Sequence, residues 1–280
     1  MTEAYKADTP LHDTPVEVRN VAGSGPFLLV CEHASNFIPP EYATLGLDGA
    51  ALESHIAWDP GALAVADEMA RLLDAPLVAA RVSRLVYDCN RPPESPSAMP
   101  AESEIYRIPG NAGLTDAARQ ARTQAVYVPF REALARAIDA HGARCGPPAI
   151  VTVHSFTPVW RGAARAVEIG ILHDDDAGLA DAMLRAAGDG GGGFLVRRNE
   201  PYGPQDGVTH TLREHALPRG LANVMIEIRN DLIQTPDDVR TMAGRLAGWL
   251  VAARAEADGG NARERDMPGK DISGKDMARG

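Results

Sequence analysis

The chain has 280 residues, of which 45% are hydrophobic, and a formal net charge of -10. This length can bury one sizeable core, and the negative charge argues against nucleic acid or an anionic membrane as the main partner, because either would repel most of the surface. Cys31, Cys89 and Cys145 form no CxxC pair, so we expect no disulfide framework and a reducing, cytoplasmic location.

The ends of the chain differ from its centre in composition. Residues 1–24 are polar and predict an N-terminal extension without the apolar core of a signal peptide. Residues 25–257 predict a single catalytic α/β domain, and no apolar stretch approaches the roughly 18 residues of a membrane span. Residues 258–280 are charged and nearly without aliphatic side chains, which predicts a disordered tail.

Strand-like and helix-like patterns alternate through the central domain. In chain order, we expect a strand at 27–32, a helix at 60–73, strands at 77–80 and 84–88, a helix at 115–140, strands at 149–154 and 166–172, a helix at 177–187, strands at 194–197 and 223–228, and a helix at 236–256. Pro129 predicts a kink or break in the second helix, because proline removes a backbone donor. The alternation predicts an α/β sheet covered by helices on both faces.

Two histidines end two of the buried strands. LLVCEH ends in His33, and AIVTVH ends in His154, which precedes Ser155. In open α/β sheets, ligands bind at the edge where the strands end, so both imidazoles are expected at one site. A histidine pair of this kind is typical of a hydrolytic zinc centre, which takes three protein ligands and keeps one position open.

The third ligand has several candidates. Asp59 in HIAWDPGA is the best of them, although an aspartate before Pro60 is equally explained as the cap of the following helix. Glu32 and His55 are the reserve candidates. Glu32 should point to the opposite face of its strand from Cys31.

A carboxylate interrupts the aliphatic strand NVMIEI. Burying Glu227 there would cost several kcal/mol unless it is paired or faces a polar site. As a general base it would take a proton from water and pass it to the leaving amine. The alternative is an internal ion pair with Arg229, because residues two apart share one face of a strand.

Two further segments carry groups that could hold a substrate. RVSRLVYDCNRPPES places Arg84, Asn90 and Arg91 around a short strand, where guanidinium groups could bind a carboxylate, although a surface turn with salt bridges is the simpler interpretation. The polar segment RRNEPYGPQDGVTHTLREHA predicts a loop over the site, from which Tyr202 and His210 could contact substrate. We also expect Ser155 and Arg229 to contact the substrate.

Taken in order, these segments resemble the N-formylglutamate amidohydrolase family. The resemblance runs from about residue 27 to about residue 250 and rests on CEHASNFIP, HIAWDPGA, SRLVYDCNRP, TVHSF, NEPYGPQDGVTHTLREHA and IEIRNDLI. The family is similar to zinc carboxypeptidases. That similarity implies a zinc-exopeptidase-like fold, a three-layer α/β/α arrangement with a mixed, mostly parallel central sheet.

The resemblance also implies roles for individual residues. By position, His33 and His154 would bind zinc, Glu227 would be the base, Asn90 and Arg91 would hold a substrate carboxylate, and Arg84 would polarise the scissile carbonyl. Asn36 stands where the carboxypeptidases have a glutamate ligand, so the resemblance favours Asp59 as the third ligand.

We therefore expect a metal-dependent hydrolase with one Zn²⁺ per chain, although other divalent ions would suit the same ligands. It would cleave the amide bond of a small anionic N-acyl amino acid such as N-formylglutamate. Two alternatives remain. The first is a carboxypeptidase-like hydrolase of a peptide or cell-wall amide, and the second is a non-catalytic protein that binds a carboxylate.

Overall fold

The computed structural model describes residues 14–188 and 191–265, and the side chains of the last helix as far as residue 256. Within this part of the chain, the central sheet has seven strands in the order β1-β3-β2-β6-β11-β9-β10. Their bounds are β1 Val16–Arg19, β2 Phe27–Cys31, β3 Leu77–Ala80, β6 Ala149–Phe156, β9 Ile169–Leu172, β10 Val196–Arg198 and β11 Asn223–Arg229. The pairings β2–β3, β2–β6, β6–β11 and β9–β10 are parallel, whereas β1–β3 and β9–β11 are antiparallel.

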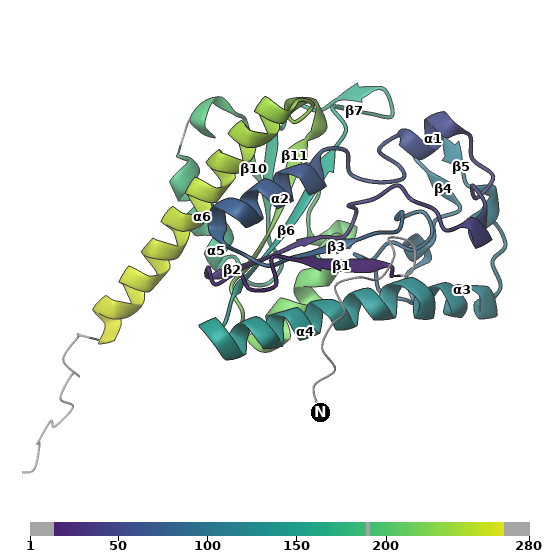
Figure 1. The fold of residues 1–280 in the computed structure, drawn as a ribbon. Coiled ribbons are helices and arrows are strands. Elements are labelled where there is room, and N and C mark those ends of the chain that lie inside the picture. Colours follow the sequence, from purple (N-terminus) through teal and green to yellow (C-terminus); the bar gives the residue numbers. More distant parts are fainter. Residues whose placement is uncertain (1–13, 189–190, 266–280) are drawn as a thin grey trace, which may run out of the picture.

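Helices cover both faces of this sheet (Figure 1). On one face lie α2 (Ala62–Leu73), α5 (Gly178–Ala187) and α6 (Pro236–Arg265), and α6 packs against both of the others. On the other face, α3 (Asp116–Arg122) leads through a π-helical turn, Thr123–Tyr127, into α4 (Val128–Cys145). The predicted three-layer arrangement with a mixed, mostly parallel sheet is confirmed.

The five inner strands, β3, β2, β6, β11 and β9, are buried on both faces, which explains their nearly unbroken hydrophobic runs. In β2, Leu29 and Cys31 pack toward α2, whereas Leu28 and Val30 belong to the core on the α4 side. The same alternation continues in β6 and β11. Glu32, His154 and Glu227 each follow a residue of this α4-facing set by two positions. Their side chains therefore project toward the α4 side, at the site described below.

Several short elements lie outside the main layers. These are α1 (Gly49–Glu53), the hairpin of β4 (Glu102–Ser103) with β5 (Tyr106–Arg107), and the hairpin of β7 (Val159–Trp160) with β8 (Ala163–Ala164). A second π-helical turn spans Leu212–Ala216. None of these elements was expected from the sequence, because each is too short to have a recognisable periodicity.

Two predicted elements need correction. Residues 84–88 form turns rather than a strand, with Val86 N–H bonded to the Ser83 carbonyl at 2.9 Å and Arg91 N–H bonded to the Asp88 carbonyl at 3.0 Å. The strand expected at 166–172 begins only at Ile169. The interruption expected near Pro129 takes the form of the π-helical turn Thr123–Tyr127, which ends just before α4, where Pro129 is the second residue.

Both predicted terminal segments contain regular structure. β1 lies within the predicted N-terminal extension and pairs antiparallel with β3. The last helix runs to Arg265, into the predicted tail, and residues 266–280 lie outside the described residues. In the described part of the chain, no helix combines the length and apolar character needed to cross a membrane.

Candidate active site

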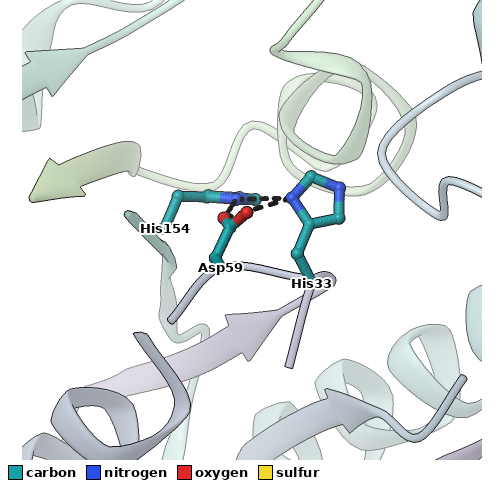
Figure 2. A group of neighbouring side chains, drawn as sticks. All are labelled: His33, Asp59 and His154. Carbon is teal, nitrogen blue, oxygen red and sulfur yellow. Dashed lines mark hydrogen bonds and ion pairs between the residues drawn. The ribbon is translucent and has the colours of Figure 1, made fainter. Parts of the chain in front are cut away.

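Three buried side chains converge at the carboxyl edge of the sheet (Figure 2). The Nδ1 atoms of His33 and His154 lie 3.2 Å apart. Asp59 Oδ2 lies 3.2 Å from His33 Nδ1 and 2.9 Å from His154 Nδ1. Among the described residues, this is the group whose atoms could hold a metal ion.

The fold explains why these residues meet. β2 and β6 are parallel neighbours, so His33, just beyond β2, and His154, in the last part of β6, reach the same edge. Asp59 comes from the segment before α2, where its backbone N–H donates to the His33 carbonyl at 2.9 Å. The cap of α2 is Gly61, not Asp59. The alternative that Asp59 merely caps the helix is therefore wrong.

Each histidine contacts a carboxylate through its other ring nitrogen. His33 Nε2 lies 2.7 Å from Asp88 Oδ1, and His154 Nε2 lies 3.1 Å from Glu32 Oε2. The His33–Asp88 contact is a hydrogen bond, whereas His154 Nε2 and Glu32 Oε2 lie close together without forming one. A proton on each Nε2 would leave the Nδ1 lone pairs facing one another and Asp59. In that protonation state three electron-pair donors meet at one point, where a cation could bind.

The carboxylates around the group favour positive charge on both histidines. Burial alone would lower the pKa of His154, but the Glu32 and Asp59 carboxylates raise it well above its usual value. The pKa of His33 is also raised. Burial and Arg84 oppose this rise, and the Asp88 and Asp59 carboxylates bring it about. The pKa of Asp59 is lowered despite burial, because His33 and His154 stabilise its charged form. The site thus favours positive charge at its centre.

The two reserve ligand candidates have other partners. Glu32 projects away from Cys31 as expected, but it contacts the outer nitrogen of His154 rather than the point where the Nδ1 atoms meet. His55 Nε2 lies 2.9 Å from Glu104 Oε2. Neither residue belongs to the group that could hold a metal ion.

Glu227 lies beside this group on the neighbouring strand. It is paired with His154 in the register of β11 and β6 and is 4% exposed. Its Oε2 atom has no hydrogen-bond partner among the described residues. Burial raises the pKa of Glu227 to about 7, with Asp59 acting in the same direction and His154 opposing it. Such a carboxyl group can both accept and release a proton near neutral pH.

The alternative ion pair between Glu227 and Arg229 is not formed. Arg229 instead contacts Asp231 at 2.8 Å and Glu168 at 3.4 Å, and it donates to the Arg165 carbonyl at 3.2 Å. It lies at the end of β11, where it can turn toward these loop residues. Arg229 is not among the residues that line the cavity described next.

A cavity of about 310 Å³ opens over the three converging side chains. Its buried floor includes His33, Asp59, His154 and Glu227. The expected substrate contacts at its walls are Arg84, Asn90, Arg91, Ser155 and Tyr202. His210 does not line it and instead lies 2.8 Å from the Tyr127 hydroxyl through Nε2.

The polar side chains of the cavity walls differ in the contacts that they make with other residues. Arg84 contacts Asp88 at 2.8 Å and Asp59 at 3.3 Å. The Asn90 amide donates to the Val208 carbonyl and accepts from the Thr211 N–H, so it ties down the loop above it. Ser155 donates to the Pro60 carbonyl at 2.8 Å.

Arg91 is engaged least. Its guanidinium donates to Ser97 Oγ and the Asn90 carbonyl, and it forms no ion pair within the described part of the chain. It is therefore the wall cation whose charge is available to an anionic ligand.

Two groups of residues that shape this site were not predicted from the sequence. Asp88 stands in the segment YDCNRP, yet nothing local indicates that it reaches His33, 55 residues away. Phe156 and Trp160 also line the cavity, and the short hairpin that carries Trp160 has no sequence signal.

A mixed α/β/α sheet with two histidines, an aspartate and a glutamate at its carboxyl edge defines a class of α/β proteins with a candidate hydrolytic centre. Within that class, the family model of the N-formylglutamate amidohydrolases matches residues 25–234. The chain belongs to the N-formylglutamate amidohydrolase family. This membership confirms the resemblance stated above and supports amide hydrolysis as the activity.

Solved structures agree in fold. Gene product Atu2144 from Agrobacterium tumefaciens is 56% identical, with a TM-score of 0.86, covering 89% of this chain and 98% of that one. An N-formylglutamate amidohydrolase from Ralstonia eutropha JMP134 is 20% identical, with a TM-score of 0.55, covering 88% of this chain and 99% of that one, and is similar in fold. No curated protein matches the chain.

Proposed function

We propose that the chain is a zinc-dependent amidohydrolase that cleaves the amide bond of a small N-acyl amino acid, with N-formylglutamate as the expected substrate. One observation carries the metal-dependent part of this proposal. His33 Nδ1, His154 Nδ1 and Asp59 Oδ2 converge within 3.2 Å of one another, beside the Glu227 carboxyl group. Family membership supports the amide-hydrolysing part.

The donor set suits zinc. Two imidazole nitrogens and a carboxylate oxygen are a common catalytic zinc set, which leaves one position open. With ligand distances of about 2.0–2.1 Å, neighbouring ligand atoms of a tetrahedral zinc ion lie about 3.3 Å apart. The separations of 2.9, 3.2 and 3.2 Å among the three atoms are within a few tenths of an ångström of that value. The site would take one ion per chain.

A bound zinc ion would supply Lewis-acid polarisation of a carbonyl and would lower the pKa of water toward neutrality. Glu227 is the expected general base. Its unpartnered Oε2 can accept a proton from the attacking water and return it to the departing amine, and its burial favours uptake of that proton.

The arginines would bind and orient the substrate. Arg84 is fixed by Asp59 and Asp88, so its position is set before a substrate enters, and it would polarise the scissile carbonyl. Arg91 would bind a substrate carboxylate, because its guanidinium forms no ion pair within the described residues. Asn90 supports this wall by holding residues 208–211.

The deciding experiment is an activity assay of protein stripped of metal by a chelator and then restored with zinc. The substrates would be N-formyl-L-glutamate, N-acetyl-L-glutamate and a dipeptide with a free carboxylate. We expect turnover of the N-acyl amino acids only after zinc is restored. Turnover unaffected by chelation would contradict the metal dependence.

Two other results would each replace the proposal with an alternative. Cleavage of the dipeptide alone would favour a carboxypeptidase-like hydrolase. Binding of N-formylglutamate without metal and without turnover would favour a carboxylate-binding protein. A variant with Arg197, an exposed side chain on β10, changed to alanine serves as a control and should behave as the parent does.

A further inference from the structure

Two short hairpins meet beside the cavity. The β7–β8 hairpin follows β6 directly, a few residues beyond His154, and projects from the end of the sheet (Figure 1). The β4–β5 hairpin comes from a distant part of the chain. Half-buried residues of both, Trp160 and Ser103, line the cavity together with His55, whereas the floor residues are buried. We call these three residues the rim of the cavity.

A single carboxylate connects the segments that form this rim. Glu104 Oε2 lies 2.9 Å from His55 Nε2, and Glu104 Oε1 accepts the backbone N–H of Arg161 at 3.0 Å. The Glu104 side chain is only 12% exposed. Because Arg161 directly follows Trp160, Glu104 ties the turn of the β7–β8 hairpin to the segment that carries His55.

The backbone at this junction is strained on both sides. Glu104 has φ of +54° and Arg161 has φ of +49°, a left-handed conformation that residues other than glycine seldom adopt. Such conformations persist where the surrounding contacts hold them in place. Losing the Glu104 contact should therefore release both turns.

The Trp160 ring is held by cations and by His55. Its centroid lies 5.2 Å from the Arg165 guanidinium carbon and 5.9 Å from that of Arg161, and its ring meets the His55 ring edge to face at 6.3 Å. Arg165 also lies over the rings of Tyr202 and Phe156, which line the cavity as well. The indole thus occupies one defined position at the rim.

We propose that Glu104 is a positioning residue that holds Trp160 over the cavity, and that Trp160 thereby restricts the enzyme to short, free N-acyl amino acids. The specificity part of this inference rests on the function proposed above. The positioning part does not, since it concerns contacts that exist without substrate or metal.

The positioning part is tested by limited trypsin digestion, because Arg161 is an exposed trypsin site within the turn. Glu104→Ala should raise the rate of cleavage after Arg161 by about tenfold, because the turn opens locally before it is cut. Glu104→Gln, which can still accept the Arg161 N–H, should fall between the parent and Glu104→Ala. Glu102→Gln, on the same hairpin but exposed, is the matched control and should leave the rate unchanged.

Equal cleavage rates in the parent and Glu104→Ala would overturn the positioning role. A thermal melt of each variant identifies a general loss of stability. A variant that exposes Arg161 only by unfolding as a whole, with cleavage rising equally at other arginines, would also count against the proposal.

The specificity part is tested with kcat/KM for N-formyl-L-glutamate against two longer compounds, N-butanoyl-L-glutamate and N-formyl-L-glutamylglycine. Trp160→Ala should raise the relative kcat/KM of at least one longer compound by about tenfold, the discrimination that a hydrophobic wall typically provides. Glu104→Ala should shift the ratio in the same direction, and Trp160→Phe should shift it less.

Unchanged ratios in both alanine variants would overturn the specificity role. A shift in Trp160→Ala without one in Glu104→Ala would overturn the role of Glu104. If the parent cleaves none of the three compounds, the proposed function is wrong, and the specificity role, which rests on it, is wrong as well. The digestion result would still decide the positioning role.

Discussion

His33 and His154 face each other through Nδ1 atoms 3.2 Å apart, while the Nε2 atom of each contacts a different buried carboxylate. Asp88 lies beside the first ring and Glu32 beside the second. With a proton on each Nε2, each histidine would present a lone pair to the same point, next to Asp59. Metal-binding histidines are commonly oriented by carboxylates in this way.

This relationship predicts that the parent protein binds zinc and that His154→Ala does not. Zinc should raise the melting temperature of the parent, since a ligand at a hundred times its Kd adds about 2.7 kcal/mol to the free energy of unfolding. Elemental analysis and a thermal melt measure the two effects. His173→Ala is the control, because His173 lies beside three aspartates yet outside the candidate group, and it should retain the metal.

The outer carboxylates should control metal affinity without being ligands. Asp88→Asn and Glu32→Gln are each expected to weaken zinc binding by about 10- to 100-fold, because the ring nitrogens lose a charged partner. Competition with a chromophoric chelator measures this change. Asp174→Asn alters a buried carboxylate that contacts Thr209 instead, so its affinity should match the parent. Parental affinity in both site variants would contradict the orienting role.

Glu227→Gln should lower kcat by about 10²- to 10⁴-fold, the contribution expected of a positioned general base. Its zinc content should stay at the parental level, because Glu227 is not part of the group that could hold the ion. Steady-state kinetics and elemental analysis on the same sample separate the two effects. Retained activity would remove Glu227 from this role.

The raised pKa of Glu227 also predicts how stability depends on pH in the metal-free protein. Its folded pKa of about 7 lies above its ordinary value of 4.5, so the folded state prefers the protonated form. This contribution to stability is complete below pH 4.5 and is lost as the pH rises through about 7.

Glu227→Gln mimics the protonated form at every pH. Its free energy of unfolding, relative to the parent, should therefore increase between pH 4.5 and 7 and then level off, by at most about 3 kcal/mol at 1.36 kcal/mol per pKa unit. Urea titrations at several pH values measure this difference. Glu132→Gln, on an exposed face of α4, should show no such trend. A difference that does not vary with pH would contradict the raised pKa.

Arg91→Ala should raise KM for N-formylglutamate by about 10- to 100-fold, because a hydrogen bond to a charged group contributes about 1.5–3 kcal/mol. Arg91→Lys should recover part of the loss, since lysine keeps the charge but not the paired donors. An unchanged KM in Arg91→Ala would show that this arginine does not bind the carboxylate.

The local pattern of the sequence was enough to predict most of the sheet. The aliphatic runs of β2, β6 and β11 are buried on both faces, so their composition alone marks them as strands. Residues 84–88 have a similar composition but form turns, because an apolar run indicates burial and does not specify the backbone conformation.

The residues of the candidate site also divide into those that the sequence could predict and those that it could not. Three residues could be predicted because each interrupts or ends a buried strand, where an unpaired polar side chain costs free energy. These are His33, His154 and Glu227. The sequence ranked Asp59 above Glu32 and His55 without settling the third ligand, and it assigned His210 and Arg229 to a cavity that neither lines. Those outcomes depend on where side chains in loops and at strand ends point, which no local pattern encodes.

What the amino-acid sequence determined by itself is therefore the set of buried strands and the polar residues at their ends, because periodicity and burial are local properties. The tertiary structure alone decided which side chains meet. β2, β6 and β11 are distant in sequence but adjacent in the sheet, and that order brings Glu32 beside His154, whereas the turns after β3 bring Asp88 beside His33. The convergence of His33, Asp59 and His154 on one point is a consequence of strand order and loop path.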